Sequence, residues 1–523
     1  MKTQTHFSAE IKHWLALAAI CLGIFMALLD VTVVNVALPT VQKDFNESFD
    51  NLQWIINAYT MMYAVFLLVF AKLGDLFGRK RFFQLGMVIF TLGSLASALS
   101  QSGLQLNLAR GVQGVGGAAM MSLSMAIVAA TFTGQERGIA LGIWSSVIGL
   151  ATAIGPLVGG ILVQLFSWRA IFLINIPIGI IALVLGRWFI NDSYGNRHGH
   201  IDLIGLILST LAIFAIILGL LQKENHPSWA WSNLHIVGLL VGGFILLVSF
   251  VLIERHLSDP MIDMHMFASP SFVGSAVASF GLGAGLYAFY TYLTVLMQNY
   301  IGYSAMQTGI RQLTISVFSL FLGPIVGMLT NRFSNRWLAF SGLVSISLGL
   351  WLIYRSINPT VTYVDFALGF VFLGLGNATV NPPLSSAAIG GVKPEHVGMA
   401  SGIANVFRQF GISFGVVTLG IQLTNAYQQS LTASLPSIKL PQTALSGIQH
   451  GLLSAGPFSG PAVLASSRAS QLRRLPAFKA VHGAVINAFD LGMKHVLLLS
   501  MVFTIGGAIA AALLIRDHDD FNQ

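Results

Sequence analysis

The sequence has little charge and a single cysteine. Charged residues make up 9% of its 523 residues, whereas soluble domains carry about 25%. Hydrophobic residues make up 55% of the chain, so a fold of this length could not cover its surface for water. A soluble protein is therefore excluded, and a polytopic membrane protein is expected. The lone Cys21 excludes an intramolecular disulfide and a thiolate metal cluster.

Motifs for catalysis and nucleotide binding are also missing. The chain has no glycine-rich phosphate loop ending in Gly-Lys-Ser/Thr, which argues against ATP as the energy source. Its 13 histidines are scattered without metal-ligand spacing. The net charge of +8 is explained by basic residues beside membrane helices rather than by nucleic acid. We therefore expect no enzyme, no metal, no cofactor and no nucleic-acid partner.

Long apolar runs dominate what is present. Windows of about 19 apolar residues identify membrane-spanning helices. Fourteen such segments are predicted, at 13–37, 51–72, 82–101, 104–130, 138–165, 168–190, 202–222, 234–253, 271–298, 308–329, 337–357, 361–389, 399–423 and 492–515. The expected fold class is thus an all-α polytopic membrane protein.

Basic residues predict the orientation of these segments. Arg79 and Lys80 follow the second segment, Arg137 the fourth and Arg332 the tenth, whereas the alternate loops are poorer in such residues. Basic loops stay in the cytoplasm, so both termini are expected on the cytoplasmic side. The expected location of the protein is a bacterial plasma (inner) membrane. The long outer loop at 424–491 is also basic, but loops of this length largely escape the rule.

The long outer loop changes in composition along its length. The stretch up to about 465 is rich in Ser, Gly and Pro, and the stretch LRRLPAFKAVHGAVINAFDLG at 472–492 is amphipathic. Basic amphipathic helices can lie in the membrane interface. We therefore predict an interfacial helix that leads into the last spanning segment.

An internal repeat divides the chain. AKLGDLFGRKR at 71–81 and GMLTNRFSNRW at 327–337 share a pattern and occupy equivalent places. This repeat predicts an N-terminal six-helix half at 1–190, two additional helices at 191–260, and a C-terminal six-helix half at 261–523. Repeated halves that enclose a site at the membrane midplane are the common plan of secondary transporters.

Asp30 is the one acid in the first apolar segment, within FMALLDVTVVNVALP. An ionised carboxylate at the centre of a membrane costs about 2.5–3.5 kcal/mol. Burial favours its protonated form, and a nearby cation favours its charged form. Arg110 in the fourth segment could supply that cation, which would couple proton movement to a change of shape. The alternatives are a neutral structural aspartate and an arginine bonded to backbone carbonyls.

Two further motifs indicate a gate and a close helix contact. In GDLFGRKR, Asp75 ends a helix, Gly78 permits a tight turn, and Arg79 and Lys80 can pair with acidic groups or lipid phosphates; a simple topology anchor is the alternative. In GLATAIGPLVGG, small residues allow close helix approach and a proline introduces a bend. The residues of this second motif are Gly149, Gly155, Pro156, Gly159 and Gly160.

Polar and aromatic side chains inside the predicted segments are candidates for lining a substrate cavity. They are Asn35, Trp54, Asn57, Tyr59, Gln113, Tyr290, Asn377, Asn381, Asn405, Arg408 and Gln409. For the aromatic members, core packing and interface belts are the alternative. The double proline after Asn381 predicts a break in the twelfth segment.

Four of these motifs together resemble the major facilitator superfamily. AKLGDLFGRKRFF, LARGVQGVGGAAM, GLATAIGPLVGG and LLDVTVVNVALP, in a chain of fourteen segments, are similar to the drug:proton antiporter branch of the EmrB/QacA type. The resemblance implies two six-helix halves with two extra central helices. It also implies that Asp75 caps a helix of the opposite half, that Arg110 controls proton release, and that the Gly-Pro motif limits proton leak in an exporter.

The function expected from this resemblance is multidrug efflux, and hence antibiotic resistance, by alternating access driven by the proton gradient. Partners would be protons, membrane lipids and a hydrophobic or amphiphilic compound, with a periplasmic adaptor protein if the source is a two-membrane bacterium. The scarcity of acids in the C-terminal segments argues against strictly dicationic compounds. The alternatives are a transporter of a dedicated metabolite, lipid or siderophore, an uptake symporter, and a membrane protein that does not transport.

Overall fold

The computed structural model describes residues 9–45, 49–195, 202–226, 229–257, 260–438, 442–465 and 477–516, and these ranges contain helices and connecting turns without strands. The first seven helices are α1 (Ala9–Phe45), α2 (Phe49–Phe77), α3 (Arg79–Leu99), α4 (Gly103–Thr131), α5 (Gly134–Leu165), α6 (Ala170–Leu173) and α7 (Asn175–Phe189). A hairpin of α8 (Leu203–Asn225) and α9 (Leu234–Glu254) follows.

The remaining chain begins with a short 3₁₀ turn, η1 (Met264–Ala268). The ninth span is continuous through α10 (Pro270–Leu282), the π-turn η2 (Gly283–Tyr287), α11 (Ala288–Val295) and the π-turn η3 (Leu296–Tyr300). The other elements are α12 (Ala305–Leu329), α13 (Asn335–Ser356), α14 (Tyr363–Gly390), η4 (Pro394–His396), α15 (Val397–Ser434), η5 (Leu435–Ser437), α16 (Gln442–Ala465) and α17 (Phe478–Leu514).

The predicted membrane-spanning segments are confirmed as long apolar helices. Among the described residues, 13 helices are long and apolar enough to cross a membrane, and the bent α5 brings the number to 14. The two parts of α5 meet at 46° between Thr152 and Ile154. Pro156 lies just beyond, where its ring excludes the hydrogen bond to the carbonyl of Thr152. The protein is an integral membrane protein.

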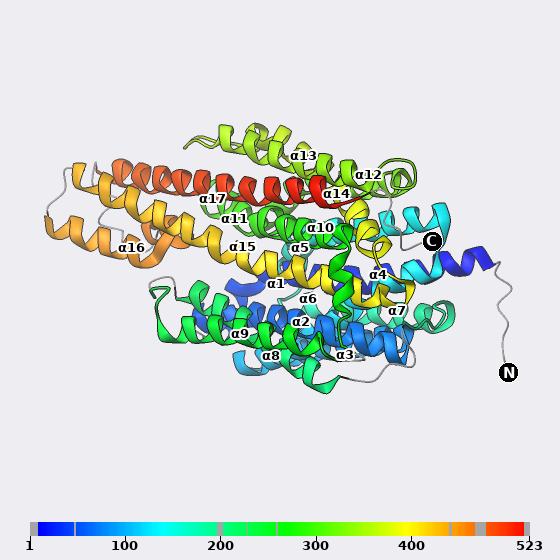
Figure 1. Ribbon diagram of the computed structural model, residues 1–523. Coiled ribbons are helices and arrows are strands. Elements are labelled where there is room, and N and C mark those ends of the chain that lie inside the picture. The colour runs from blue at the N-terminus through cyan, green and yellow to red at the C-terminus, as the bar shows by residue number, and fades with distance from the viewer. Residues whose placement is uncertain are drawn as a thin grey trace.

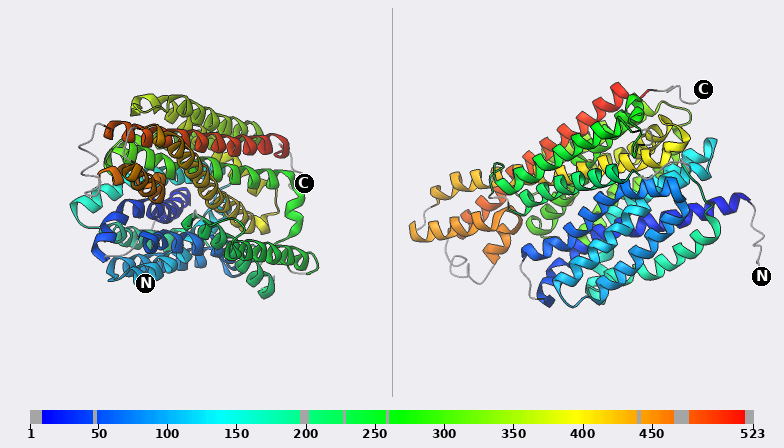
Figure 2. Two further views of the ribbon diagram at one scale, coloured as in Figure 1. Left: turned by 90° about the vertical axis from the view of Figure 1, so that its left-hand side faces the viewer. Right: turned by 60° about the horizontal axis from the view of Figure 1, so that its bottom comes forward.

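The helices form one elongated bundle, with both described ends of the chain at the same side (Figure 1). We call this side the termini face. Helices α1 to α4, α6 and α7 contact mainly one another, as do α10, α11 and α13 to α17, whereas α5 and α12 make the most extensive contact between the two groups. Helix α8 contacts both α2 and α15, so the α8–α9 hairpin lies at the edge of the seam between the two groups (Figure 2).

Glycines make the closest contact across this seam, between α5 and α12. A Cβ atom placed on Gly138 would lie 2.2 Å from the carbonyl oxygen of Gly327, and one on Gly142 would lie 2.4 Å from that of Gly323. No real side chain fits at such distances. The small residues therefore let the two backbones touch, as in other membrane helix pairs.

Two expectations are wrong. The described parts of the predicted outer loop, 424–438, 442–465 and 477–491, are largely helical, because α15 and α17 continue far beyond one membrane thickness and α16 packs on them (Figure 1). The predicted interfacial helix at 472–492 lies partly outside the described residues, and from Phe478 onward it is the first part of α17. A helix that packs lengthwise on its neighbours buries its apolar face there rather than in the interface.

The predicted break in the twelfth segment is also absent. Helix α14 runs unbroken through Pro382 and Pro383. Each proline removes one backbone bond, but this part of the helix is buried and packs on α12 and α13. That tertiary packing holds the helical course.

Candidate functional site

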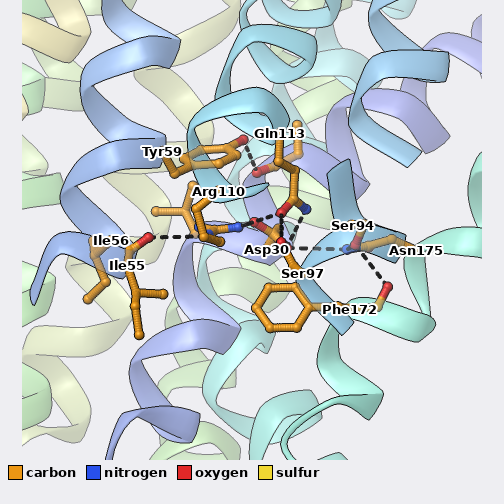
Figure 3. A network of polar contacts seen from close by, with 12 residues as sticks. Asp30, Ile55, Ile56, Tyr59, Ser94, Ser97, Arg110, Gln113, Phe172 and Asn175 are labelled. Carbon is orange, nitrogen blue, oxygen red and sulfur yellow. Dashed lines mark hydrogen bonds and ion pairs between the residues drawn. The ribbon is translucent and has the colours of Figure 1, made fainter. Parts of the chain in front are cut away.

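The buried acid of α1 meets the buried arginine of α4 (Figure 3). Arg110 Nη1 forms an ion pair with Asp30 Oδ2, and both side chains are 1% exposed. Two charges this deep require each other, because a lone buried charge is far more costly than a pair. The two residues singled out in the sequence thus lie in direct contact, although they are 80 positions apart.

The second carboxylate oxygen of Asp30 receives two neutral donors. Gln113 Nε2 donates to Oδ1 at 2.9 Å, and Asn175 Nδ2 donates to the same oxygen at 3.2 Å. Asn175 also donates to Ser94 Oγ at 3.0 Å, and Ser94 in turn donates to the Phe172 carbonyl at 2.9 Å. Side chains of α4 and α7 therefore bond directly to this carboxylate of α1, and Ser94 of α3 contacts it only through Asn175.

Arg110 has partners beyond the acid. Its Nε donates to the Ile55 carbonyl at 3.1 Å, and its Nη1 donates to Gln113 Oε1 at 2.9 Å. The guanidinium carbon lies 4.4 Å from the centre of the Tyr59 ring, which is a cation–π distance. Arg110 can therefore keep a polar and aromatic environment if Asp30 becomes neutral.

Sequence reasoning missed Asn175 and Ser94 as members of this site. Asn175 stands in the apolar stretch SWRAIFLINIPIG, and a polar amide there was a usable signal. Ser94 gives no comparable signal, because small hydroxyl residues occur throughout membrane helices and bond to their own backbone. Tyr59 and Gln113, predicted to line a cavity, instead belong to the ion-pair site.

A second charged site lies at the termini face. Asp75 accepts hydrogen bonds from Arg79 Nε at 2.7 Å and from the backbone N–H of Met399 at 3.1 Å. Met399 is in the first turn of α15, whose free N–H groups and dipole favour a negative charge. An acid of α2 thus caps a helix from the other group of the bundle.

The turn after Asp75 requires glycine. Gly78 has φ 113°, which L side chains rarely adopt. Arg79 then begins α3 and its N–H donates to the Ser193 carbonyl at 2.9 Å, while Lys80 Nζ donates to the Arg187 carbonyl at 3.0 Å. The basic residues of this motif therefore contact protein groups in the structure.

The Gly-Pro motif of α5 lies between the acid-bearing helix and the other half. A Cβ on Gly155 would collide with Thr32 of α1, and one on Gly159 would lie 3.1 Å from the Val33 carbonyl. On the other side Gly149 faces Ser319 and Asn377, and Gly160 faces Met306. Helix α5 therefore lies between α1 and α12 and contacts α1 at Thr32 and Val33.

The polar residues predicted in the C-terminal segments form a separate cluster. Asn381 Nδ2 donates to Tyr287 Oη at 3.1 Å and to Asn377 Oδ1 at 3.0 Å, and Asn377 Nδ2 donates to Ser319 Oγ at 3.1 Å. Arg408 is 7% exposed, and its Nε and Nη1 have no hydrogen-bond partner among the described residues. A buried cation without a bonded anion can attract acceptor groups.

The other predicted cavity residues lie elsewhere. Trp54 packs on α8 beside Ile217 and Leu221, and the exposed Asn35 donates to the Val31 carbonyl at 3.4 Å. Asn405 donates to the Ser401 carbonyl at 2.9 Å. The others are Asn57, which is buried in α2, Tyr290, which packs near Tyr287, and the half-buried Gln409.

Comparisons with known proteins agree with this architecture. The family model described as "Major Facilitator Superfamily" matches residues 20–416. "Multidrug resistance protein Stp" of Mycobacterium tuberculosis is 34% identical over 78% of this chain and 75% of its own length. The "Tetracenomycin C resistance and export protein" of Streptomyces glaucescens is 31% identical over 79% and 76%.

A solved structure shares the fold at low identity. The human organic anion transporter MFSD10 (TETRAN) superposes with a TM-score of 0.57 at 15% identity, covering 94% of this chain and 99% of that one. Likeness at this level concerns the fold alone.

Proposed function

The chain belongs to the major facilitator superfamily, and its relatives include a multidrug resistance protein and a tetracenomycin C resistance and export protein. We propose that it is a drug-efflux transporter driven by protons that pass through Asp30. The compound is small, hydrophobic or amphiphilic, and leaves chemically unchanged. The single observation that carries proton coupling is the fully buried Asp30–Arg110 ion pair. The protein lies in the plasma membrane of a bacterium, with the termini face toward the cytoplasm.

Proton coupling follows from two alternative sets of bonds. In the structure, Arg110, Gln113 and Asn175 all donate to Asp30, and this arrangement stabilises the charged carboxylate. A proton on Asp30 removes the attraction to Arg110, which keeps its bonds to Gln113 and to the Ile55 carbonyl. Loss of the pair frees α1 from α4, so that proton binding favours a different packing of the first half.

The contact between Asp75 and α15 serves as the gate at the termini face. It joins the two halves while the carboxylate accepts from Arg79 and from Met399 N–H. Opening toward the cytoplasm requires this contact to break, and release of the compound on the opposite side requires it to hold. Alternating access then depends on two buried acids: Asp30 binds the proton, and Asp75 closes the termini face.

Arg408 and the amides of Asn377 and Asn381 are the groups that we propose for substrate recognition. The guanidinium offers donors without bonded partners in the described part of the chain. Compounds that carry acceptor oxygens on an apolar frame fit such a site, whereas two positive charges on the compound would be repelled by it.

The test compares Asp30→Asn with the native protein in proteoliposomes that contain a pH-sensitive dye. Compounds are first chosen by a growth-inhibition panel in a host that lacks its own exporters. Native protein should move protons when a compound is added, and Asp30→Asn should not. Asp44→Asn, at a partly exposed acid near the end of α1, is the control and should still move protons when a compound is added. Undiminished proton movement in Asp30→Asn would contradict the proposal.

A further inference from the structure

Two carboxyl groups of the α8–α9 hairpin face each other at the termini face, outside both sites described above. Asp202 precedes the first residue of α8, and Glu254 is the last residue of α9. We propose that Asp202 and Glu254 form a proton-binding site that holds one shared proton and fastens the hairpin beside the gate. This site is independent of the proton path through Asp30.

The two groups are close because the residue between them is glycine. A Cβ atom placed on Gly205 would lie 2.1 Å from Asp202 Oδ2 and 2.2 Å from Glu254 Oε1, so both oxygens occupy the space that a side chain would need. Two oxygens this close to one point are neighbours, and no side chain lies between them. Glu254 is 2% exposed, so its carboxyl group is shielded from bulk water.

The hydrogen bonds around the pair leave room for one proton. Asp202 Oδ1 accepts from Gly205 N–H at 2.9 Å, and Glu254 Oε2 accepts from Ile262 N–H at 3.1 Å. The other two oxygens, Asp202 Oδ2 and Glu254 Oε1, are buried and have no donor among the described residues. One proton on Glu254 Oε1, donated to Asp202 Oδ2, gives every carboxyl oxygen a partner.

The helix ends determine which acid carries the proton. Asp202 is an N-cap residue, where the helix dipole favours a negative charge. Glu254 stands at a helix C-terminus, where the dipole opposes a negative charge. Glu254 is therefore the protonated member, and Asp202 is the charged acceptor.

The charged groups around the pair agree with one proton. Lys72 of α2 attracts the Glu254 carboxylate and donates to the Pro260 carbonyl at 2.7 Å. With the proton on Glu254, the positive charge of Lys72 balances the negative charge of Asp202. Without the proton, Glu254 adds a second negative charge that no cation compensates. The exposed Arg255 and His256 directly follow Glu254. Further titratable groups along this face are Asp263, whose Oδ2 lies 3.3 Å from His396 Nε2, and the exposed His265.

The position of the site gives the proton a consequence for the gate. Glu254 accepts a hydrogen bond from the backbone N–H of Ile262. Asp263, the residue after Ile262, contacts His396 just before α15. Helix α15 begins at Val397, and its Met399 N–H donates to the Asp75 carboxylate that caps the helix. Loss of the shared proton would therefore loosen the link between the hairpin and the end of α15 that forms the gate.

The test uses infrared difference spectra and thermal unfolding of the purified full-length protein. The native spectrum at neutral pH should contain a protonated carboxyl band that is absent from Glu254→Gln. Because Gln and Asn supply a permanent N–H donor in place of the proton, Glu254→Gln and Asp202→Asn should unfold at a temperature that changes less with pH. The native unfolding temperature should fall as the pH rises far enough for the folded state to lose the shared proton.

Two controls keep the test decisive. Asp263→Asn removes the neighbouring ion pair and should leave the carboxyl band in place. Asn caps a helix as well as Asp, so Asp202→Asn is informative even if Glu254→Gln does not fold. The proposal is overturned if the band persists in Glu254→Gln, or if native protein and Asp202→Asn show the same dependence on pH.

Discussion

The backbone N–H of Met399 donates a 3.1 Å hydrogen bond to the carboxylate of Asp75, across 324 residues of sequence. The bond joins the end of α2 to the first turn of α15, and Arg79 holds the same carboxylate from α3. A charge-assisted bond at a buried helix terminus is stronger than a bond between neutral groups. The contact is therefore suited to hold one side of the bundle closed.

Gly398 allows this closure, and a methyl group there should disrupt it. A Cβ atom on Gly398 would lie 2.0 Å from Asp75 Oδ1, so Gly398→Ala must push the carboxylate away from Met399. We expect a longer distance between spin labels on α2 and α15 at the termini face, and at least a tenfold loss of transport. Gly506→Ala, where a Cβ atom meets nothing within 4 Å, is the matched control. Unchanged label distances in Gly398→Ala would count against a gate at Asp75.

Arg110 should not be replaceable by lysine. Lysine retains the charge but cannot reach Asp30, Gln113 and the Ile55 carbonyl together. Each lost bond to a charged group costs about 1.5–3 kcal/mol, so Arg110→Lys should lower the rate of compound-driven proton movement by tenfold or more. Arg169→Lys, in the exposed pair with Asp44, should leave the rate unchanged. An Arg110→Lys protein with native rates would show that charge alone suffices at this site.

The glycine contact between α5 and α12 should tolerate no added methyl group. A Cβ atom on Gly327 would lie 2.0 Å from the Gly138 carbonyl oxygen. Overpacking of this kind costs about 1–3 kcal/mol, and Gly327→Ala should lower the unfolding temperature and reduce transport. Gly242→Ala on the open face of α9 is the control, because a Cβ atom there meets nothing within 4 Å. This variant should keep the native unfolding temperature and transport.

Much of the fold could be predicted because membrane helices are long and apolar throughout. The first and fourth segments, with Asp30 and Arg110, were recognisable as single charges in apolar runs. Their contact was not derivable from spacing, since it depends on how α1 packs on α4. Asn175 joined the site for the same reason, through the approach of α7 to α1.

The failures have a common physical cause. The extensions of α15 and α17 contain Ser, Gly and charged residues that hydropathy assigns to a loop, yet these helices gain stability by packing on each other and on α16. Pro382 and Pro383 were expected to end a helix that tertiary contacts keep intact. Local sequence signals therefore failed where packing between distant segments decided the structure.

The last prediction concerns the end of the bundle opposite the termini face. Asp44 Oδ2 accepts from Trp168 Nε1 at 2.9 Å and from Arg169 Nη1 at 3.0 Å, and these hydrogen bonds hold the pKa of Asp44 below its ordinary value. The stability from this contact is present above the ordinary pKa of an aspartate, and it is lost as the pH falls through the lowered pKa of the folded state.

Asp44→Asn should therefore unfold at a lower temperature than native protein at neutral pH, and the difference should disappear in acid. Trp168→Phe keeps an aromatic ring beside Phe45 but removes the bond that contributes most to the lowered pKa, so it should reproduce most of the change. Unfolding temperatures measured across an acid pH series would check both variants. A difference between native protein and Asp44→Asn that stays constant down to low pH would show that packing, rather than the charge of Asp44, holds α1 to the residues that precede α6.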